Sequence, residues 1–337
     1  MPKENTIKIG GLAVTNPVLL APMSGVSDLP FRRLAHQLGA DFVVSEMVAS
    51  ADLMRGRQDV RLRALGQDLN PFVIQLVGHD PFWMGEAARY CEDIGADIID
   101  INMGCPAREV TGKQSGSALM RELPLATEIV QSVVKAVSVP VTLKMRLGWD
   151  RSSLNAPELA AISEASGIQM LTVHGRTRCD FFKGQADWRG VRPVSDAVGI
   201  PVVVNGDIAS FSNLTQALDD SGADGVMVGR GAYGAPWLPA RLSSHWRDGS
   251  DPGAPSLSRI GSIALEHVQA MLSHYGVFLG LRNSRKHIAW YLDHGRLSAG
   301  ETKDWRRRLC TSEQPKDVLA GLTEFFSRCR ENAEVGA

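Results

Sequence analysis

Short runs of apolar and β-branched residues recur at regular intervals through the first 230 residues of the chain. Each run is short enough for a strand and apolar enough to be buried on both faces, as the strands of a parallel sheet are. We therefore predict eight strands, at residues 17–21, 41–45, 72–77, 97–102, 140–145, 170–174, 201–205 and 225–229.

The segments between these runs have the apolar spacing of helices. The clearest are residues 81–94, 124–137, 154–166 and 210–220, which carry a capping serine, a first-turn proline or a terminal glycine. Eight strands alternating with helices predict an α/β fold, a (β/α)8 TIM barrel. The open doubly wound sheet is the alternative, and it is disfavoured because no G-x-G-x-x-G follows the first strand.

The pattern changes after a Gly/Pro/Ser-rich stretch, GSDPGAPS, at residues 249–256. Strand signals end there, and helical spacing continues over 259–275, 283–294 and 316–330. We therefore expect a barrel domain over residues 1–248, a linker over 249–256, a C-terminal all-helical domain over 257–330 and a frayed tail over 331–337.

Composition narrows the class of protein. The five cysteines are scattered and include no C-x-x-C pair, which argues against a disulfide framework or a zinc site. No apolar stretch approaches the roughly 20 residues that span a bilayer, and the polar first ten residues do not resemble a signal peptide. We expect a cytoplasmic protein without a metal ion or membrane partner, and a monomer.

The formal net charge is only −1, but charge is distributed unevenly. Residues 280–310 hold eight basic and three acidic side chains, a local excess of five positive charges. Such a cluster favours a polyanionic partner such as a nucleic acid, although a solvated helix face would have the same pattern. Arg282, Arg285 and Lys286 are the leading phosphate contacts, ahead of Arg306–Arg308.

Polar residues follow all eight predicted strands. In a TIM barrel these strand ends meet on one face, where active sites form. Gly206, Gly229 and Gly231 after the last two strands would let backbone amides approach a phosphate, which Arg230 would also bind. Turns need glycine too, so the glycines alone are weak signals.

Lys144 lies within a predicted buried strand, where an unpaired ammonium is costly. A flavin would supply a partner, because its N1–C2 carbonyl edge becomes negative on reduction. A lysine that reaches solvent at the rim is the alternative. Gln75 and Asn205 would then bond the amide edges of the isoalloxazine ring, unless they are satisfied core amides.

Cys105 lies between Gly104 and Pro106 in a loop that follows a strand. A thiol with an ordinary pKa near 8.5 is protonated at neutral pH and can act as a general acid. It can also be a nucleophile where a base activates it, but no second motif supports that role. His174, at another strand end, would contact the flavin or the substrate base, or is structural.

Taken together, these motifs resemble the tRNA-dihydrouridine synthase family, most closely its bacterial B subfamily. The resemblance spans residues 7–330, and its most specific elements are NMGCP, KMR and HGRT. The matching segments are PMSGVSDLPFRRL, SEM, QLVG, DINMGCPAREVTGKQSGSALM, VTLKMRLGW, TVHGRTR, VNGDI, VGRGAYGAPW and YGVFLGLRNSRKHIAWYLDHG.

The resemblance implies an FMN cofactor over the strand ends, reduced by NADPH, and a tRNA substrate. It implies hydride transfer to C6 of a uracil and protonation of C5 by Cys105, with Asn102 and Arg176 on the substrate side. The FMN-binding residues it implies are Pro22, Met23, Ser24, Gln75, Lys144, His174, Asn205, Gly206, Asp207, Gly229 and Arg230. Arg108 and Glu109 depart from the two basic residues expected there, which leaves local tRNA contacts open.

The base would have to be turned out of the RNA to reach a flavin inside a barrel, and this requires a grip on the surrounding phosphates. Two alternatives remain. An FMN barrel reductase of a free small molecule would share the phosphate site but not the basic helical domain. A non-catalytic flavin- and RNA-binding protein would have no need of Cys105.

Overall fold

The computed structural model describes residues 6–15 and 17–335. It divides into two compact units, one of Met1–Gly231 with Leu238–Asp251, the other of Ala232–Trp237 with Pro252–Ala337. The division between Asp251 and Pro252 falls inside the Gly/Pro/Ser-rich stretch. We call the first the barrel unit and the second the helical unit, and describe each by itself.

The barrel unit contains one sheet of eight parallel strands in the order β3-β10-β9-β8-β7-β6-β5-β4. Seven of them coincide with predicted runs to within one or two residues, since continuous apolar runs suit strands covered on both faces. The strands are β3 (Val18–Leu20), β4 (Val48–Ala49), β5 (Val73–Val77), β6 (Ile98–Met103), β7 (Val141–Arg146), β8 (Leu171–His174), β9 (Val202–Asn205) and β10 (Gly225–Val228).

The second predicted strand, residues 41–45, is wrong as a continuous strand. It is reduced to two parallel bridges, Leu20 with Val43 and Val44 with Val73, and β4 begins only at Val48. The bridges nevertheless close the barrel between β3 and β5. The ladder stops at Ser45, because its hydroxyl accepts the Gln75 backbone N–H at 2.9 Å and donates to the Glu46 carbonyl at 2.8 Å.

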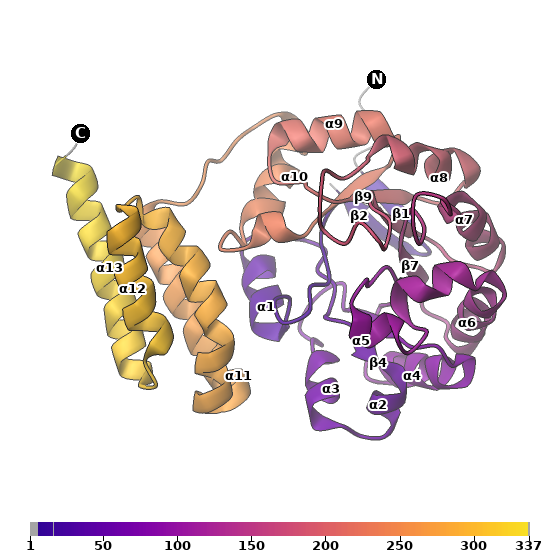
Figure 1. The fold of residues 1–337 in the computed structure, drawn as a ribbon, viewed down its shortest axis with the longest axis horizontal. Helices are drawn as coiled ribbons and strands as arrows, with labels where there is room; N and C mark the ends of the chain where they lie inside the picture. Colours follow the sequence, from indigo (N-terminus) through magenta and orange to yellow (C-terminus); the bar gives the residue numbers. More distant parts are fainter. Residues whose placement is uncertain (1–5, 16, 336–337) are drawn as a thin grey trace. The chain divides into compact units, whose positions relative to one another are not determined.

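Helices surround the sheet in the βα alternation that was predicted (Figure 1). Ser210 caps α9 with its side chain as predicted, and Asp80 caps α4 in the same way, which was not predicted. The helices are α1 (Leu29–Gln37), α2 (Ser50–Met54), α3 (Gln58–Arg63), α4 (Pro81–Asp93), α5 (Arg108–Thr111), α6 (Leu123–Ala136), α7 (Ala156–Ala165), α8 (Arg192–Ala197), α9 (Phe211–Ser221) and α10 (Leu238–Asp248), with 3-10 turns η1 (Gly116–Arg121), η2 (Arg189–Val191) and η3 (Arg230–Ala232).

An N-terminal hairpin, β1 (Thr6–Ile9) with β2 (Leu12–Thr15), was not predicted. Its inward side chains Ile7, Ile9 and Val14 join the same buried cluster as barrel residues such as Leu19 and Val73. These barrel residues lie near the start of their strands, so the hairpin covers the end opposite to the strand ends that carry the polar residues.

The helical unit consists of α11 (Leu257–Leu292), η4 (Asp293–Gly295), α12 (Ala299–Thr311) and α13 (Pro315–Val335) (Figure 1). Two helices were expected where α11 runs, and the interruption is confined to Gly276, whose φ of 76° is left-handed. Helix α12 was not predicted, although Ser298 and Glu301 form a capping box at its start. Within the expected tail 331–337, α13 continues to Val335, and residues 336–337 lie outside the described ones.

No helix in residues 6–15 and 17–335 is long and apolar enough to cross a membrane. Within the same ranges, no three His, Cys, Asp or Glu side chains are grouped so that they would hold a metal ion.

Candidate active site

The parallel register sets the expected site residues side by side at the carboxyl ends of the strands. Asn102 on β6 is opposite Lys144 on β7, and His174 on β8 is opposite Asn205 on β9. Gln75 on β5 is opposite Asp100. All of these side chains are buried, so each polar atom needs a partner inside the barrel or in a bound molecule.

Asp100 is the anchor of a chain of side-chain hydrogen bonds across three strands. Its carboxylate accepts from Thr142 Oγ1 at 2.6 Å and from Gln75 Nε2 at 2.7 Å. Gln75 Oε1 then accepts from Asn102 Nδ2 at 2.8 Å. An ionised carboxylate can only accept, so Asp100 fixes which way both amides point. Burial raises the pKa of Asp100, against the two donors that lower it.

This series of hydrogen bonds ends at the loop that carries Cys105. Asn102 Oδ1 accepts the backbone N–H groups of Gly104 at 3.2 Å and of Cys105 at 2.9 Å. The Cys105 carbonyl accepts from Ser117 Oγ at 2.8 Å. The thiol is half-buried, and burial raises its pKa above the ordinary value of 9.0 although Arg146 and Lys144 act to lower it. Cys105 is therefore a thiol at neutral pH and suits the role of a proton donor.

Lys144 has one polar partner among the described residues. Its Nζ donates to Asn205 Oδ1 at 3.2 Å, and Asn205 in turn donates through Nδ2 to the Met227 carbonyl at 2.7 Å. Burial and the nearby Arg146 lower the pKa of Lys144 to about 8. A buried ammonium with so few acceptors favours an anionic or electron-rich group beside it.

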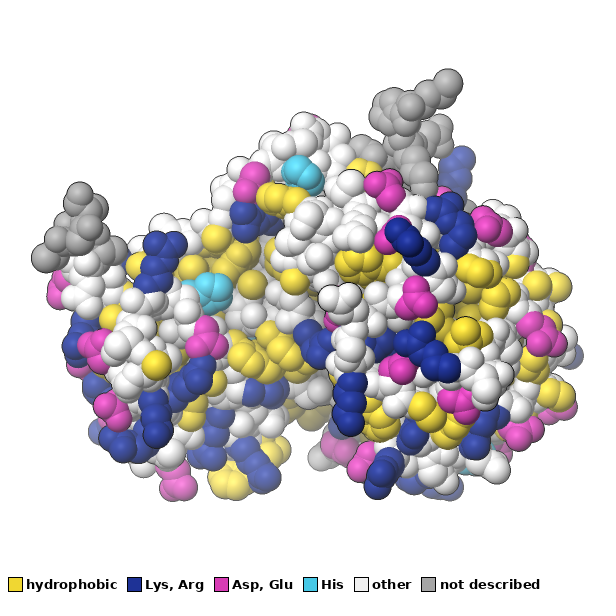
Figure 2. All heavy atoms as spheres, turned by 45° about the horizontal axis from the view of Figure 1, so that its top comes forward, with side chains coloured by type: hydrophobic (Ala, Val, Ile, Leu, Met, Phe, Trp, Pro, Cys, Tyr) yellow, Lys and Arg dark blue, Asp and Glu magenta, His cyan; other side chains and the backbone are white. Residues whose placement is uncertain are grey.

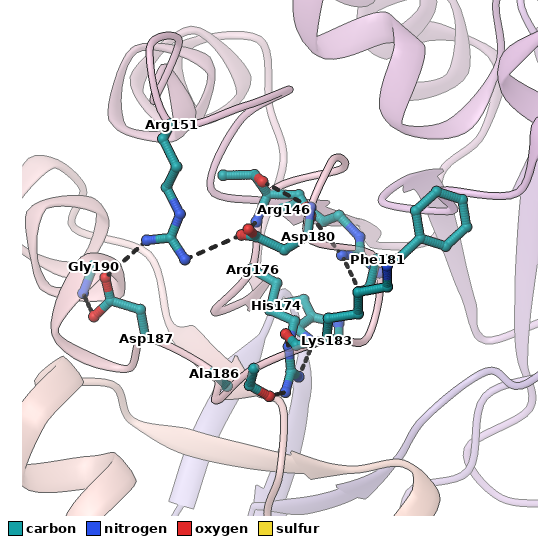
Figure 3. A network of polar contacts seen from close by, with 12 residues as sticks. Arg146, Arg151, His174, Arg176, Asp180, Phe181, Lys183, Ala186, Asp187 and Gly190 are labelled. Atoms are coloured by element: carbon teal, nitrogen blue, oxygen red, sulfur yellow. Dashed lines mark hydrogen bonds and ion pairs between the residues drawn. The ribbon is translucent and has the colours of Figure 1, made fainter.

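Arg146, two residues after Lys144, ties two loops together (Figure 3). Its guanidinium donates to the carbonyl oxygens of Gly104 at 2.7 Å, Thr177 at 2.8 Å and Phe181 at 2.8 Å. The loop of Cys105 is thereby joined to the loop after β8. The sequence marked Arg146 as a polar strand end but did not assign it a role.

Arg176 also acts within the protein. It is buried and donates to the Lys183 carbonyl at 3.0 Å, the Gly184 carbonyl at 2.6 Å and Asp207 at 2.5 Å (Figure 3). Its Nη1 lies 3.2 Å from His174 Nε2. Since the arginine can only donate, this His174 nitrogen accepts and the other carries the proton. Burial, then Arg146 and other cations, hold the pKa of His174 well below its usual value, so the ring is neutral.

Asp207 joins Arg176 to Arg230, the residue expected to bind a phosphate. Its second oxygen accepts from Arg230 at 2.9 Å. Burial acts to raise the pKa of Asp207, but the hydrogen bonds from Arg176 and the Ala186 N–H, with the charges of Arg176 and Arg230, hold it below 3.8. Asp207 is therefore a carboxylate whose oxygens are used to position two arginines.

The glycines of this region meet different constraints. A Cβ on Gly206, whose φ is +118°, would lie 2.8 Å from Ala186 and 3.0 Å from the His174 ring. Gly229 has no neighbouring atom closer than 3.8 Å to such a Cβ, and that atom is Met23 Sδ. Close packing therefore accounts for Gly206, whereas Gly229 leaves open space beside Met23.

The residues after β3 complete the rim. Pro22 and Met23 are half-buried and Ser24 is exposed. The Gly25 N–H donates to the buried carboxylate of Glu46, which fixes this loop against the residues after Ser45. Glu46 was noted in the sequence only as a polar strand end.

Phe182 was not predicted as a site residue. It is 49% exposed, and its ring centroid lies 5.2 Å from the Arg230 guanidinium carbon and 5.4 Å from that of Arg146. The His174 ring is 6.2 Å away. An exposed aromatic side chain at the edge of a polar site offers a stacking surface for a flat ligand.

The expected cations of the helical unit differ in exposure. Arg282 is exposed and has no ion pair among the described residues, and Arg285 and Lys286 are half-buried. By contrast, Arg306, Arg307 and Arg308 pair with Asp293, Asp304 and Glu324. Figure 2 shows Lys and Arg side chains together with acidic ones over this unit.

Polar side chains that converge at the carboxyl ends of eight parallel strands define a TIM-barrel enzyme. Solved structures share the fold at low identity. They include 2-naphthoyl-CoA reductase (TM-score 0.57, 14% identity, 72% of this chain and 52% of the other). Another is histamine dehydrogenase from Rhizobium sp. 4-9 (TM-score 0.54, 13% identity, 80% and 51%). The match spans about half of each of these larger proteins.

Sequence comparison identifies the family. The family model described as Dihydrouridine synthase (Dus) matches residues 19–330, so the chain belongs to the dihydrouridine synthase family. A probable tRNA-dihydrouridine synthase of Rhodobacter capsulatus is 51% identical over 96% of this chain and 98% of that protein. The tRNA-dihydrouridine synthase B of Pseudomonas putida is 42% identical over 98% and 97%.

Proposed function

We propose that this chain is an FMN-dependent tRNA-dihydrouridine synthase, which reduces the C5=C6 bond of a uridine in tRNA with NADPH as the reductant. The observation that carries the proposal is the position of Cys105, a protonated thiol held by Asn102 and Ser117 beside a buried lysine. Membership of the dihydrouridine synthase family and the names of the relatives support the substrate.

The side chains at the strand ends suit a flavin phosphate. Lys144, Arg146, Arg176 and Arg230 are four cations, against the three carboxylates of Glu46, Asp100 and Asp207. A net positive site favours a phosphate and the negative charge of a reduced flavin. Lys144 has a single acceptor among the described residues, so a bound flavin would supply a second acceptor for its ammonium group.

The roles within the chain follow from these contacts. Pro22, Met23 and Ser24 would pack at the flavin ring, with Gln75, Lys144 and His174 at its polar edge. Asn205 would orient Lys144, from which it accepts a hydrogen bond, and Asp207 would orient Arg230 in the same way. Gly206, Gly229 and Arg230 would hold the phosphate end. Since Gln75 Nε2 already donates to Asp100 and Oε1 accepts from Asn102, Gln75 has one N–H left for a ligand.

FMN, when reduced by NADPH, supplies a hydride to C6 of the uracil, and the protein supplies the proton. We propose that the Cys105 thiol donates its proton to C5, so that C5 and C6 each gain one hydrogen and the pyrimidine keeps its charge. Asn102 orients the uracil edge with its remaining Nδ2 hydrogen. Arg176 acts on the substrate side by holding the 183–186 loop rather than through a free guanidinium.

The helical unit would bind the tRNA, and Arg282, Arg285 and Lys286 would contact its phosphates. Arg282 is the strongest of the three because it is exposed and has no ion pair among the described residues. Arg306, Arg307 and Arg308 already pair with carboxylates, so they have less positive charge and fewer N–H donors available for a phosphate.

The test is direct. The purified protein is incubated with FMN, NADPH and an unmodified tRNA transcript, and the digested RNA is searched for dihydrouridine by mass spectrometry. We expect a two-hydrogen mass gain on uridine that is lost in Cys105→Ala and kept in Cys179→Ala, the exposed-cysteine control. Reoxidation of the flavin by a free enone or pyrimidine, with no product in tRNA, would overturn the proposal.

A further inference from the structure

Two arginines from different loops lie over one tryptophan at the rim of the barrel. The guanidinium carbon of Arg121 is 3.8 Å from the centroid of the Trp149 ring, and that of Arg178 is 4.7 Å from it. Arg121 ends η1, Trp149 follows β7 and Arg178 follows β8. We call these three residues the rim cluster, and all of them come from segments that follow strand carboxyl ends.

The rim cluster is connected to the loop of Cys105 through a series of hydrogen bonds that includes Arg146. The backbone N–H of Arg178 donates to the Gly148 carbonyl at 3.0 Å, and that of Cys179 donates to the Trp149 carbonyl at 2.9 Å. These bonds fasten the loop after β8 to the loop after β7. Arg146 then connects both loops to the Gly104 carbonyl, one residue before Cys105.

The third segment of the rim cluster is tied to the same place. Arg121 is the last residue of η1, and Ser117 within η1 donates through its backbone N–H at 3.1 Å and its hydroxyl at 2.8 Å to the Cys105 carbonyl. The rim cluster and the reactive thiol are thus parts of one braced group of loops. A molecule that places an atom at Cys105 and continues along the surface meets these arginines.

The charges of the rim cluster are not neutralised. In the part of the chain that the structure describes, neither Arg121 nor Arg178 has a carboxylate within 4.0 Å, and the one hydrogen bond of the Arg178 guanidinium goes to Thr111 Oγ1 at 3.4 Å. Arg151, in the same group of loops, shows the contrast because it pairs with Asp180 and Asp187 (Figure 3). Two like charges at one ring repel each other, and an anion shared between them would relieve that repulsion.

A guanidinium that lies over an indole keeps its N–H edge for acceptors, because the ring interacts only with its face. Phosphate oxygens accept from this edge in bidentate geometry. The Trp149 ring already orders the long side chain of Arg121. This side chain therefore loses little conformational entropy when it binds a phosphate. The rim cluster therefore presents ordered N–H donors of the kind that a phosphate requires.

We infer that the rim cluster binds backbone phosphates of the RNA strand next to the nucleotide that is reduced. This inference rests on the proposed function, and it deepens that function by giving the barrel unit its own grip on the RNA. A base turned out towards Cys105 brings its neighbouring phosphates to the rim, where Arg121 and Arg178 neutralise them.

The experiment compares Arg121→Gln and Arg178→Gln with Lys8→Gln in the FMN-loaded full-length enzyme. Lys8 is an exposed cation on β1, at the opposite end of the barrel, so its loss changes the net charge equally. KM and kcat for an unmodified tRNA transcript are measured at several salt concentrations. We expect each arginine variant to raise KM about tenfold at unchanged kcat. We also expect it to reduce the slope of log KM against log salt by about one.

Trp149 provides a second readout that does not depend on turnover. Binding of the transcript should change tryptophan fluorescence in the wild-type enzyme, and Trp149→Phe should remove most of that change.

Arg121→Gln is the decisive variant, because Arg121 is exposed and its described contact is the ring alone. It should keep wild-type reduction of FMN by NADPH.

The outcomes separate the two proposals. If the wild-type enzyme forms no dihydrouridine in tRNA, the proposed function fails whatever the variants do. If the wild-type enzyme is active and Arg121→Gln matches Lys8→Gln in both KM and salt slope, the rim cluster does not bind RNA and only this inference fails.

Discussion

Asn102 accepts the backbone N–H of Cys105 through its side-chain oxygen, at 2.9 Å. The orientation of this amide is set two side chains away, because Asp100 accepts from Gln75 and Gln75 accepts from Asn102. The oxygens of this buried carboxylate accept from Thr142 and Gln75, so Asp100 controls where the loop of Cys105 lies. Asp100 is a positioning residue, and its effect can be measured.

Replacement of Asp100 by Asn introduces an N–H donor into this series of hydrogen bonds and allows the side-chain amides of Gln75 and Asn102 to reverse. We expect kcat to fall about 10- to 100-fold, since a misplacement of about 1 Å costs this much in a preorganised site. KM for tRNA should change little. The rate at which iodoacetamide alkylates Cys105 should change in parallel.

Thr142→Val is the matched control, because Thr142 donates to the other carboxylate oxygen of Asp100 and leaves the Gln75 bond intact. It should lower kcat less than Asp100→Asn does. Equal losses in the two variants, with unchanged alkylation of Cys105, would show that Asp100 serves only the stability of the barrel.

The pKa of Cys105 gives a prediction about pH. Burial raises it above 9.0, so the acid form persists through neutral and mildly alkaline pH. In a Cys179→Ser background, the midpoint of Cys105 alkylation against pH should lie above 9, and the proton-transfer step should slow only as pH rises through that midpoint. A midpoint near 7 would instead indicate a thiolate nucleophile.

Lys144 should titrate within the working range of the enzyme. Its pKa is lowered to about 8, so the ammonium is present below pH 8 and is lost above it. If this charge stabilises reduced flavin, the rate of FMN reduction by NADPH should fall as pH rises through about 8. Lys144→Met should be slow at all pH values, and Lys144→Arg should remove the fall above pH 8. A wild-type rate independent of pH would contradict this role.

The barrel was predictable from sequence because its strands are continuous apolar runs, a pattern that depends only on burial of both faces. The failure at residues 41–45 has a local cause. Phe42, Val43 and Val44 are apolar enough for a strand, but the Ser45 hydroxyl replaces the ladder, and nothing in the run itself predicts that bond.

The site was predictable only in part, for a similar reason. Asn102 was visible as the polar end of an apolar run, and Gln75 and Lys144 were visible as polar residues inside such runs. The role of Asp100 was not visible, because it depends on the register of β5 against β6. Phe182 lies in a loop, and its place beside Arg230 depends on contacts far apart in sequence.

The helical unit contains a pair of buried histidines that should make it sensitive to acid. His267 Nδ1 lies 3.1 Å from the Tyr291 hydroxyl, and the rings of His267 and His287 are 4.5 Å apart. Burial lowers the pKa of His267 to about 3, and burial with the His267 charge holds that of His287 well below 6.5. Lys286 lowers both further.

A lowered histidine pKa contributes stability above the unfolded-state value of about 6.5 and loses it as pH falls below that value. His267 alone should cost the unit about 2 kcal/mol between pH 7.5 and pH 5, because the unfolded chain takes up a proton that the folded unit refuses. Hydrogen exchange of α11 should therefore accelerate over this range in the wild type and much less in His267→Gln. His36→Gln, at a half-buried position on α1, should leave the pH dependence unchanged. The same acceleration in wild type and His267→Gln would assign the acid sensitivity to other groups.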